Sequence, residues 1–229
     1  MEYRTLGKTG LKISRMGFGG IPIQKIDEEG TKKLLHAMAE KGINYIDSAR
    51  GYTVSERYIG YGLEGIRDKF VLATKSMART KEAMAADIET SLNNFRTDYI
   101  DLYLLHWRGG IPLHETVEVM EQLVKEGKIK RWGVSNFDTK DMEELWKIPD
   151  GSNCAVNQVL YHLGSRGIEY DLLPWCREKK LPVMAYCPVA QGGILRKELL
   201  ANKTVRRIAG ERGISEVQVL LAWTVREKD

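Results

Sequence analysis

The stretch IDLYLLH, residues 100–106, decides how the fold of this chain is interpreted. The run is mostly apolar or aromatic with little alternation, and it ends on His106. A strand that is covered on both faces, as in a parallel sheet, has this near-continuous apolar character. We therefore expect residues 100–106 to form one strand of a parallel sheet, with a histidine at its carboxyl end.

Further short runs have the same strand-like length and composition, and helical patterns lie between them. The runs are RMGFGG (15–20), INYIDSA (43–49), FVLATK (70–75), IKRWGVSN (129–136), CAVNQV (154–159) and PVMAYCP (182–188). Apolar residues recur at a spacing of 3.6 between them, as on one face of a helix. The predicted faces are Met84/Ile88/Leu92/Phe95, Leu113/Val117/Met120/Val124 and Val217/Leu220/Leu221/Thr224, the last preceded by the capping-box spacing of Ser215 and Gln218.

Strands that alternate with helices indicate βαβ units and a parallel sheet. The strand ends are separated by about 30 residues, with one shorter step, which is the spacing of a (β/α)₈ TIM barrel of roughly 250 residues. A doubly wound open sheet fits the alternation too, but it normally carries G-x-G-x-x-G after its first strand, and GFGGIP (17–22) does not match. The pattern favours the barrel, as a single domain over residues 1–229.

The composition excludes several classes of protein. The 229 residues are 43% hydrophobic and 29% charged, with a net charge of +4, which is ordinary for a globular protein and argues against nucleic-acid binding. No run approaches the roughly 18 apolar residues of a membrane span, and the start MEYRTLGKTG does not resemble a signal peptide, so we expect a cytoplasmic protein. Cys154, Cys176 and Cys187 lack C-x-x-C spacing, so we expect reduced thiols and no metal site.

Each predicted strand after the first carries a polar residue at or near its carboxyl end. In a barrel these ends meet on one ring, which is where the active site forms. Taken singly, an aspartate there is often a helix cap, a histidine a core residue and a lysine a surface residue. Converging on one ring, they are poorly explained by caps, and a buried lysine and aspartate need each other. The residues are Asp47, Lys75, His106, Ser135 with Asn136, Gln158 and Tyr186.

The loop after the strand at 43–49 carries Tyr52, which can reach over this ring. A tyrosine has an ordinary pKa near ~10, too high for efficient proton donation at neutral pH. The ammonium of Lys75 beside it would lower that pKa, and Asp47 would hold Lys75 charged and in place. His106 could orient a substrate oxygen. The set describes the proton half of carbonyl reduction.

The segments YIDSARGY, ATK, DLYLLHW, GVSNF, VNQVLYH and AYCPVAQGG resemble, in this order, the signature segments of the aldo-keto reductases. YRTLGKTGLKISRMGFGG is similar to that family's N-terminal β-hairpin and first strand. The resemblance extends to about residue 226. It implies a (β/α)₈ barrel that reduces aldehydes and ketones with NADPH or NADH.

The resemblance also implies residue roles. Tyr52 would be the general acid, tuned by Lys75 and Asp47, and His106 would orient the carbonyl; Trp107 would face the substrate. The implied cofactor residues are Gly20, Ile21, Asp47, Ser135, Asn136, Gln158, Tyr186, which would stack on the nicotinamide, and Cys187, Pro188, Val189 and Gly192 near the pyrophosphate.

Three features depart from the family's pattern. Thr53 follows the tyrosine where glycine is usual, so the loop must turn without glycine's tolerance of positive φ. Cys187 stands where serine is common. The chain stops at LLAWTVREKD, before the family's eighth strand, the loop that grips the 2′-phosphate of NADP and the final helix. We therefore expect a barrel incomplete at its C-terminal side, with two open sheet edges.

Three hypotheses follow for function. The first is a reductase of small aldehydes or ketones, with a small carbonyl substrate, no nucleic acid, no membrane, and a monomeric full-length fold. The second is a catalytically impaired fragment that another chain completes, or that self-associates. The third is a nucleotide-sensing regulatory barrel that binds the cofactor with negligible turnover.

Overall fold

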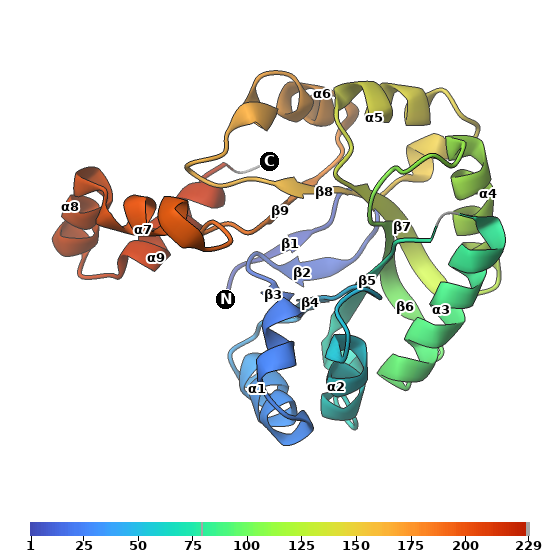
Figure 1. The fold of residues 1–229 in the computed structure, drawn as a ribbon, viewed down its shortest axis with the longest axis horizontal. Helices are drawn as coiled ribbons and strands as arrows, with labels where there is room; N and C mark the ends of the chain where they lie inside the picture. The colour runs from blue at the N-terminus through green and yellow to red at the C-terminus, as the bar shows by residue number, and fades with distance from the viewer. Residues whose placement is uncertain (79, 228–229) are drawn as a thin grey trace. The chain divides into compact units, whose positions relative to one another are not determined.

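The computed structural model describes residues 1–78 and 80–227 of the chain (Figure 1). These residues form two compact units, Met1–Val156 and Asn157–Asp229. None of the helices within the described residues is long and apolar enough to cross a membrane.

The first unit opens with an antiparallel hairpin and continues with parallel strands. The hairpin pairs β1 (Tyr3–Thr5) with β2 (Lys12–Ser14). The strands that follow form a separate sheet in which each pairs in parallel with the next one in the chain, which requires a crossover between every pair. These strands are β3 (Phe18–Gly19), β4 (Tyr45–Asp47), β5 (Val71–Ser76), β6 (Ile100–Leu105) and β7 (Ile129–Ser135).

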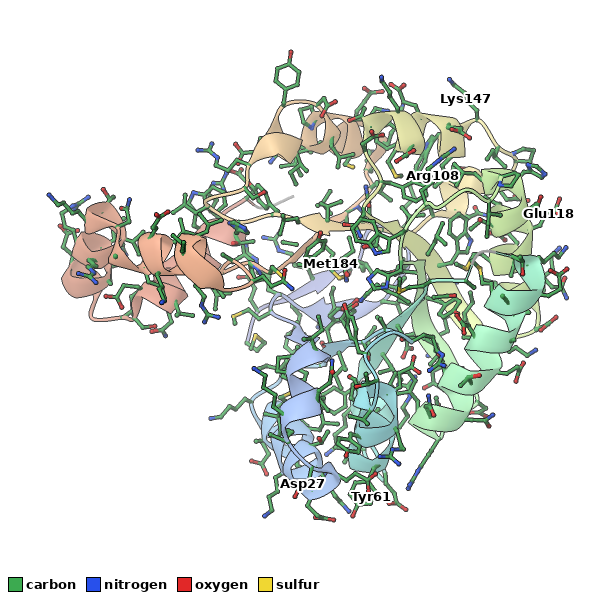
Figure 2. All side chains as sticks on the ribbon, in the orientation of Figure 1. Asp27, Tyr61, Arg108, Glu118, Lys147 and Met184 are labelled. Atoms are coloured by element: carbon green, nitrogen blue, oxygen red, sulfur yellow. The ribbon has the colours of Figure 1, made fainter. Side chains whose placement is uncertain are left out.

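The crossovers are helical, and α1 to α4 lie along the outside of the curved sheet (Figure 1). Side chains from the sheet and from these helices fill the space between them (Figure 2). The predicted face of Met84, Ile88, Leu92 and Phe95 is buried, which confirms the helical periodicity. The elements are η1 (Ile21–Lys25), α1 (Glu28–Glu40), α2 (Ser55–Gly62), η2 (Arg67–Lys69), α3 (Lys81–Phe95), α4 (Leu113–Lys125), α5 (Thr139–Trp146) and η3 (Gly151–Asn153).

The second unit is a smaller α/β element. β8 (Asn157–Leu160) pairs in parallel with β9 (Val183–Tyr186) across η4 (Gly167–Glu169) and α6 (Leu172–Lys179). α7 (Gly193–Ala201), α8 (Lys203–Arg212) and α9 (Glu216–Thr224) follow. Their buried core consists of Val205, Ala209, Val219 and Leu220.

The C-terminal helix confirms one detail of the sequence pattern and shifts another. Ser215 and Gln218 form the predicted capping box at the start of α9. Of the predicted apolar face only Leu220 is fully buried, whereas Val217 is half-buried. Val219, which was not part of the predicted face, is buried as well. α9 packs on α8, and Val219 and Leu220 lie in the core that the two helices share.

Every predicted run contains a parallel strand in the expected order, so the predicted α/β class with an N-terminal hairpin is confirmed. Most of the strands are shorter than the runs that predicted them, although β5 is as long as its run. Some sheet-like hydrogen bonds continue beyond the strand ends. After β4, the amide of Ser48 still donates to Ala73 O and that of Arg50 to Lys75 O. No eighth parallel strand occurs within the described residues. The single-domain boundary at 1–229 stays a prediction.

Candidate active site

The centre of the site is the buried cation of Lys75 on β5, whose side chain is 1% exposed. Its Nζ donates to Asp47 Oδ2 at 2.5 Å and to the carbonyl oxygen of Ser48 at 2.8 Å. The pairing of β4 with β5 produces this contact by setting the two strand ends side by side. A buried ammonium needs such a counter-charge to offset its desolvation. The alternative interpretations of Lys75 as a surface residue and of Asp47 as a helix cap are therefore wrong.

Tyr52 lies in the turn that joins β4 to α2. Its amide donates to Ala49 O at 2.9 Å, and its carbonyl accepts from the amide of Ser55 at 2.8 Å. The half-buried ring lies with its centroid 5.4 Å from Lys75 Nζ, which is cation–π distance. The ammonium of Lys75 therefore lies beside the ring of Tyr52.

The residue after the tyrosine adopts a strained backbone conformation. Thr53 has a φ of +41°, which a β-branched residue rarely adopts. Its hydroxyl donates to Gln24 Oε1 at 3.1 Å, in the segment after β3. The turn is thus made at positive φ without the glycine usual in the family, and a side-chain hydrogen bond to η1 supports it.

His106 completes the cluster from the end of β6, where its amide donates to Ser76 O at 2.9 Å. Its ring centroid is 6.1 Å from that of Tyr52, with the rings at 81°. Burial, and then the charge of Lys75, lower the pKa of His106 to about 4, against the opposing effect of Asp47. The imidazole is therefore neutral at pH 7. Its Nδ1 is buried and has no hydrogen-bond partner among the residues that the structure describes.

The strand ends next to this cluster hold the predicted cofactor residues of the first unit. Ser135 is buried at the end of β7, and Asn136 follows it at a φ of +61°. Asn136 Nδ2 donates to Ser135 Oγ and to His106 O, both at 3.1 Å, so it joins the ends of β6 and β7. A hydroxyl and an amide offer both donors and acceptors, as the carboxamide of a nicotinamide requires. Ser135 and Asn136 therefore fit that group.

Gly20 and Ile21 border the same end of the sheet. The amide of Gly20 donates to Asp47 O at 2.7 Å. A Cβ at Gly20 would lie 2.5 Å from Ser55 Oγ, so only glycine fits there without a shift. Ile21 begins η1 and is exposed.

The other predicted cofactor residues belong to the second unit. Gln158 on β8 and Tyr186 on β9 lie on paired strands, and Gln158 Nε2 is 3.2 Å from Met184 Sδ. Cys187 has a φ of +52°, and Gly192 has a φ of +145° at the N-terminus of α7. Pro188 and Val189 lie between them. That these residues approach the cluster of the first unit stays a prediction.

Two exposed apolar side chains border the cluster. Trp107 is 47% exposed, and its ring stacks near that of His106, with the centroids 6.1 Å apart. Met77, which the sequence analysis did not single out, is 46% exposed, and a Cβ added at Gly51 would lie 3.3 Å from its Sδ. Its position just after the strand that carries Lys75 is the signal that could have identified it.

Within the described residues, no group of three or more His, Cys, Asp or Glu side chains is arranged to hold a metal ion. The three cysteines are free thiols, with Cys154 and Cys176 buried.

Comparison with known proteins gives one consistent result. Residues 15–229 match the family model described as "Aldo/keto reductase family". The chain is 53% identical over 196 residues to methylglyoxal reductase YeaE of Escherichia coli (strain K12), an alignment that covers 83% of this chain and 69% of that protein.

Solved structures agree with this result. An aldo/keto reductase from Klebsiella pneumoniae in complex with NADP and acetate matches with a TM-score of 0.91 and 48% identity, over 96% of this chain and 80% of that one. An aldo-keto reductase from the same organism in complex with NADPH matches with a TM-score of 0.93 and 47% identity, over 99% and 82%.

Proposed function

Because the chain belongs to the aldo/keto reductase family, we propose that it reduces small aldehydes or ketones to alcohols, with Tyr52 as the acid that protonates the carbonyl oxygen. The observation that carries the proposal is the buried ammonium of Lys75, which contacts the Asp47 carboxylate and lies 5.4 Å from the centre of the Tyr52 ring. A nicotinamide cofactor supplies the hydride to the carbonyl carbon.

The roles of the residues follow from charge. Reduction places negative charge on the substrate oxygen, so a proton donor and positive charge nearby stabilise the transition state. Lys75 favours the phenolate that remains after Tyr52 has given up its proton. Asp47 fixes the position of the ammonium, and neutral His106 has hydrogen-bonding capacity for the carbonyl oxygen.

We propose NADPH, or alternatively NADH, as the cofactor, held by Gly20, Ile21, Ser135 and Asn136 of the first unit and by Gln158 and the Tyr186–Gly192 segment of the second. The NADP and NADPH bound by the Klebsiella pneumoniae structures support this proposal. The name of the YeaE protein supports a 2-oxoaldehyde such as methylglyoxal as the substrate. Trp107 and Met77 give the substrate side an apolar border.

The experiment compares wild-type chain, Tyr52→Phe and a matched control, Tyr170→Phe. Tyr170 is 92% exposed in the second unit, so its hydroxyl should not matter. We expect NADPH oxidation with methylglyoxal to fall at least ~100-fold in Tyr52→Phe, the usual contribution of a positioned acid, and to stay at the wild-type rate in the control. Equal turnover in wild type and Tyr52→Phe would refute Tyr52 as the acid.

Two further measurements separate the remaining hypotheses. Quenching of protein fluorescence by NADPH and by NADH compares the affinities for the two cofactors. Tight NADPH binding with no turnover would favour the regulatory barrel. A mass in solution above that of one chain, with an increase in apolar-dye fluorescence, would favour a fragment that self-associates.

A further inference from the structure

The first unit contains a second buried charge, next to the candidate site but not part of it. Glu56, in the first turn of α2, is 1% exposed. Its Oε1 accepts hydrogen bonds from Thr74 Oγ1 at 2.7 Å and Ser91 Oγ at 2.8 Å. Its Oε2 accepts from Arg50 Nη1 and Asn94 Nδ2, both at 3.0 Å. Four donors from four separate positions thus converge on one carboxylate.

The close packing of α2 on α3 allows this convergence. A Cβ at Gly60 would lie 2.2 Å from the carbonyl oxygen of Asn94, so the two backbones approach as closely as a glycine permits. Gly60 is four residues after Glu56 and therefore on the same side of α2. The Glu56 carboxylate thereby comes within hydrogen-bond distance of Ser91 and Asn94 on α3.

The ion pair between Arg50 and Glu56 closes the loop that carries Tyr52. Arg50 precedes the tyrosine by two residues and Glu56 follows it by four, so the pair spans the turn. Arg50 also lies 3.5 Å from Asp87 of α3 through Nε, and its amide donates to Lys75 O at 3.0 Å. Both ends of the loop are thereby tied to β5 and α3.

On β5, the residues on either side of Lys75 join the same network. Thr74 bonds to Glu56, and Ser76 Oγ donates to Asp87 Oδ2 at 2.7 Å. Successive side chains of a strand point to opposite faces, so these two hydroxyls face the helices while Lys75 faces the site. The network therefore fixes β5, which carries Lys75, and the loop that carries Tyr52, and it does so from the helix side of the sheet.

We propose that Glu56 is the positioning residue that sets Tyr52 relative to Lys75, acting through Arg50 and Thr74. This inference rests on the proposed function, in which the phenol must lie beside the ammonium. Glu56 itself does not touch the reacting atoms. The charge of Glu56 matters because one carboxylate oxygen holds the guanidinium of Arg50 at one end of the loop. The other carboxylate oxygen is hydrogen-bonded to Thr74 of β5.

Glu56→Gln tests the charge with little change in shape. The glutamine oxygen can still accept from Thr74 and Ser91, but its amide nitrogen then faces Arg50 and Asn94, which are also donors. Arg50 would turn towards Asp87 and take the loop with it. A displacement of about 1 Å at the reacting groups can cost roughly 100-fold in rate, so we expect kcat to fall at least ~10-fold. NADPH affinity should stay within about twofold, since none of the hydrogen bonds described above joins Glu56 or Arg50 to a proposed cofactor residue of either unit.

Asp101→Asn is the matched control. Asp101 is also buried, with a side chain 4% exposed, and it is paired with Arg67 and Lys130, each at 2.8 Å. It lies near the start of β6, at the opposite end of that strand from His106. Losing this charge should lower the melting temperature much as Glu56→Gln does, while kcat stays within about twofold of wild type.

A second readout does not depend on turnover. In protein labelled with ¹³Cζ-tyrosine, the Tyr52 signal is assigned by its absence in Tyr52→Phe, and its position and pH titration are followed. We expect both to change in Glu56→Gln and neither to change in Asp101→Asn. If Glu56→Gln does not fold, Thr74→Val removes only the link to β5, and we expect a smaller change of the same kind.

The outcomes are distinct. A Glu56→Gln protein with wild-type kcat and an unmoved Tyr52 signal, or a folded Thr74→Val protein with an unmoved signal when Glu56→Gln is unfolded, would overturn the inference. A wild-type chain without turnover, or with full turnover in Tyr52→Phe, would overturn the proposed function instead. In that case the Tyr52 signal still decides whether Glu56 positions the loop.

Discussion

Replacing Lys75 by methionine removes the cation from the centre of the site and keeps a chain of similar length. Lys75 Nζ lies 5.4 Å from the centre of the Tyr52 ring. At that separation and an effective dielectric constant of about 20, a full charge on the phenolate would interact with the ammonium by about 3 kcal/mol. This corresponds to roughly 2 pH units in the titration of the phenol.

The assay is the pH dependence of kcat for NADPH-dependent reduction of methylglyoxal. In the wild type, kcat should fall at alkaline pH, where Tyr52 has lost the proton that it must donate. In Lys75→Met this alkaline limb should move up by as much as ~2 pH units, because the phenol keeps its proton longer. The same phenol is a weaker acid, so kcat at pH 7 should fall about tenfold or more.

Lys130→Met is the control, because Lys130 also pairs with a buried carboxylate, that of Asp101, but lies 48% exposed on β7. It should leave the pH profile unchanged. The folding cost of Lys75→Met should be below the ~3–5 kcal/mol for breaking a fully buried pair, since the Asp47 side chain remains 16% exposed to water. An alkaline limb at the same pH in wild type and Lys75→Met would refute the reasoning.

Two further predictions concern stability. Thr53→Asn should raise the free energy of unfolding by about 0.5–1 kcal/mol, because asparagine tolerates the positive φ that strains threonine at this position; a lower melting temperature would contradict it. The folded-state pKa of His106, about 4, lies below its ordinary value of 6.5, so its contribution to stability is present above pH 6.5 and lost as the pH falls towards 4. Thermal unfolding between pH 4 and 8 should therefore show a shallower loss in His106→Asn than in the wild type, and parallel curves would count against the buried neutral imidazole.

The residues that meet in the candidate site could be predicted from the sequence, because parallel strands place their carboxyl ends side by side. Asp47, Lys75 and His106 each lie at or near the carboxyl end of an apolar run, and the parallel pairing of β4, β5 and β6 places these strand ends side by side. The strand lengths could not be predicted as well, since residues such as Ser48 and Arg50 hydrogen-bond beyond the strand ends. Local composition does not reveal where such a ladder stops.

Other features lay outside the reach of the sequence pattern. Nothing in the order SERYIGYG (55–62) distinguishes Glu56 from an exposed acid in the first turn of a helix, where acids are common. It is buried because Gly60 lets α2 approach α3. The positive φ of Thr53 was anticipated only as a difficulty, and the hydrogen bond to Gln24 that supports it comes from a segment far away in the chain.

The sequence alone thus determined the repeating strand–helix order, the apolar helix faces and the polar residues that end the strands. These are periodic or local features, set by which side chains can be buried together. Only the tertiary structure decided that Lys75 is buried against Asp47, that His106 is neutral at pH 7 and that Glu56 lies behind the loop of Tyr52. Each depends on distances between segments that pack together only when the chain is folded, and the ionisation of a buried group follows from its neighbours in space.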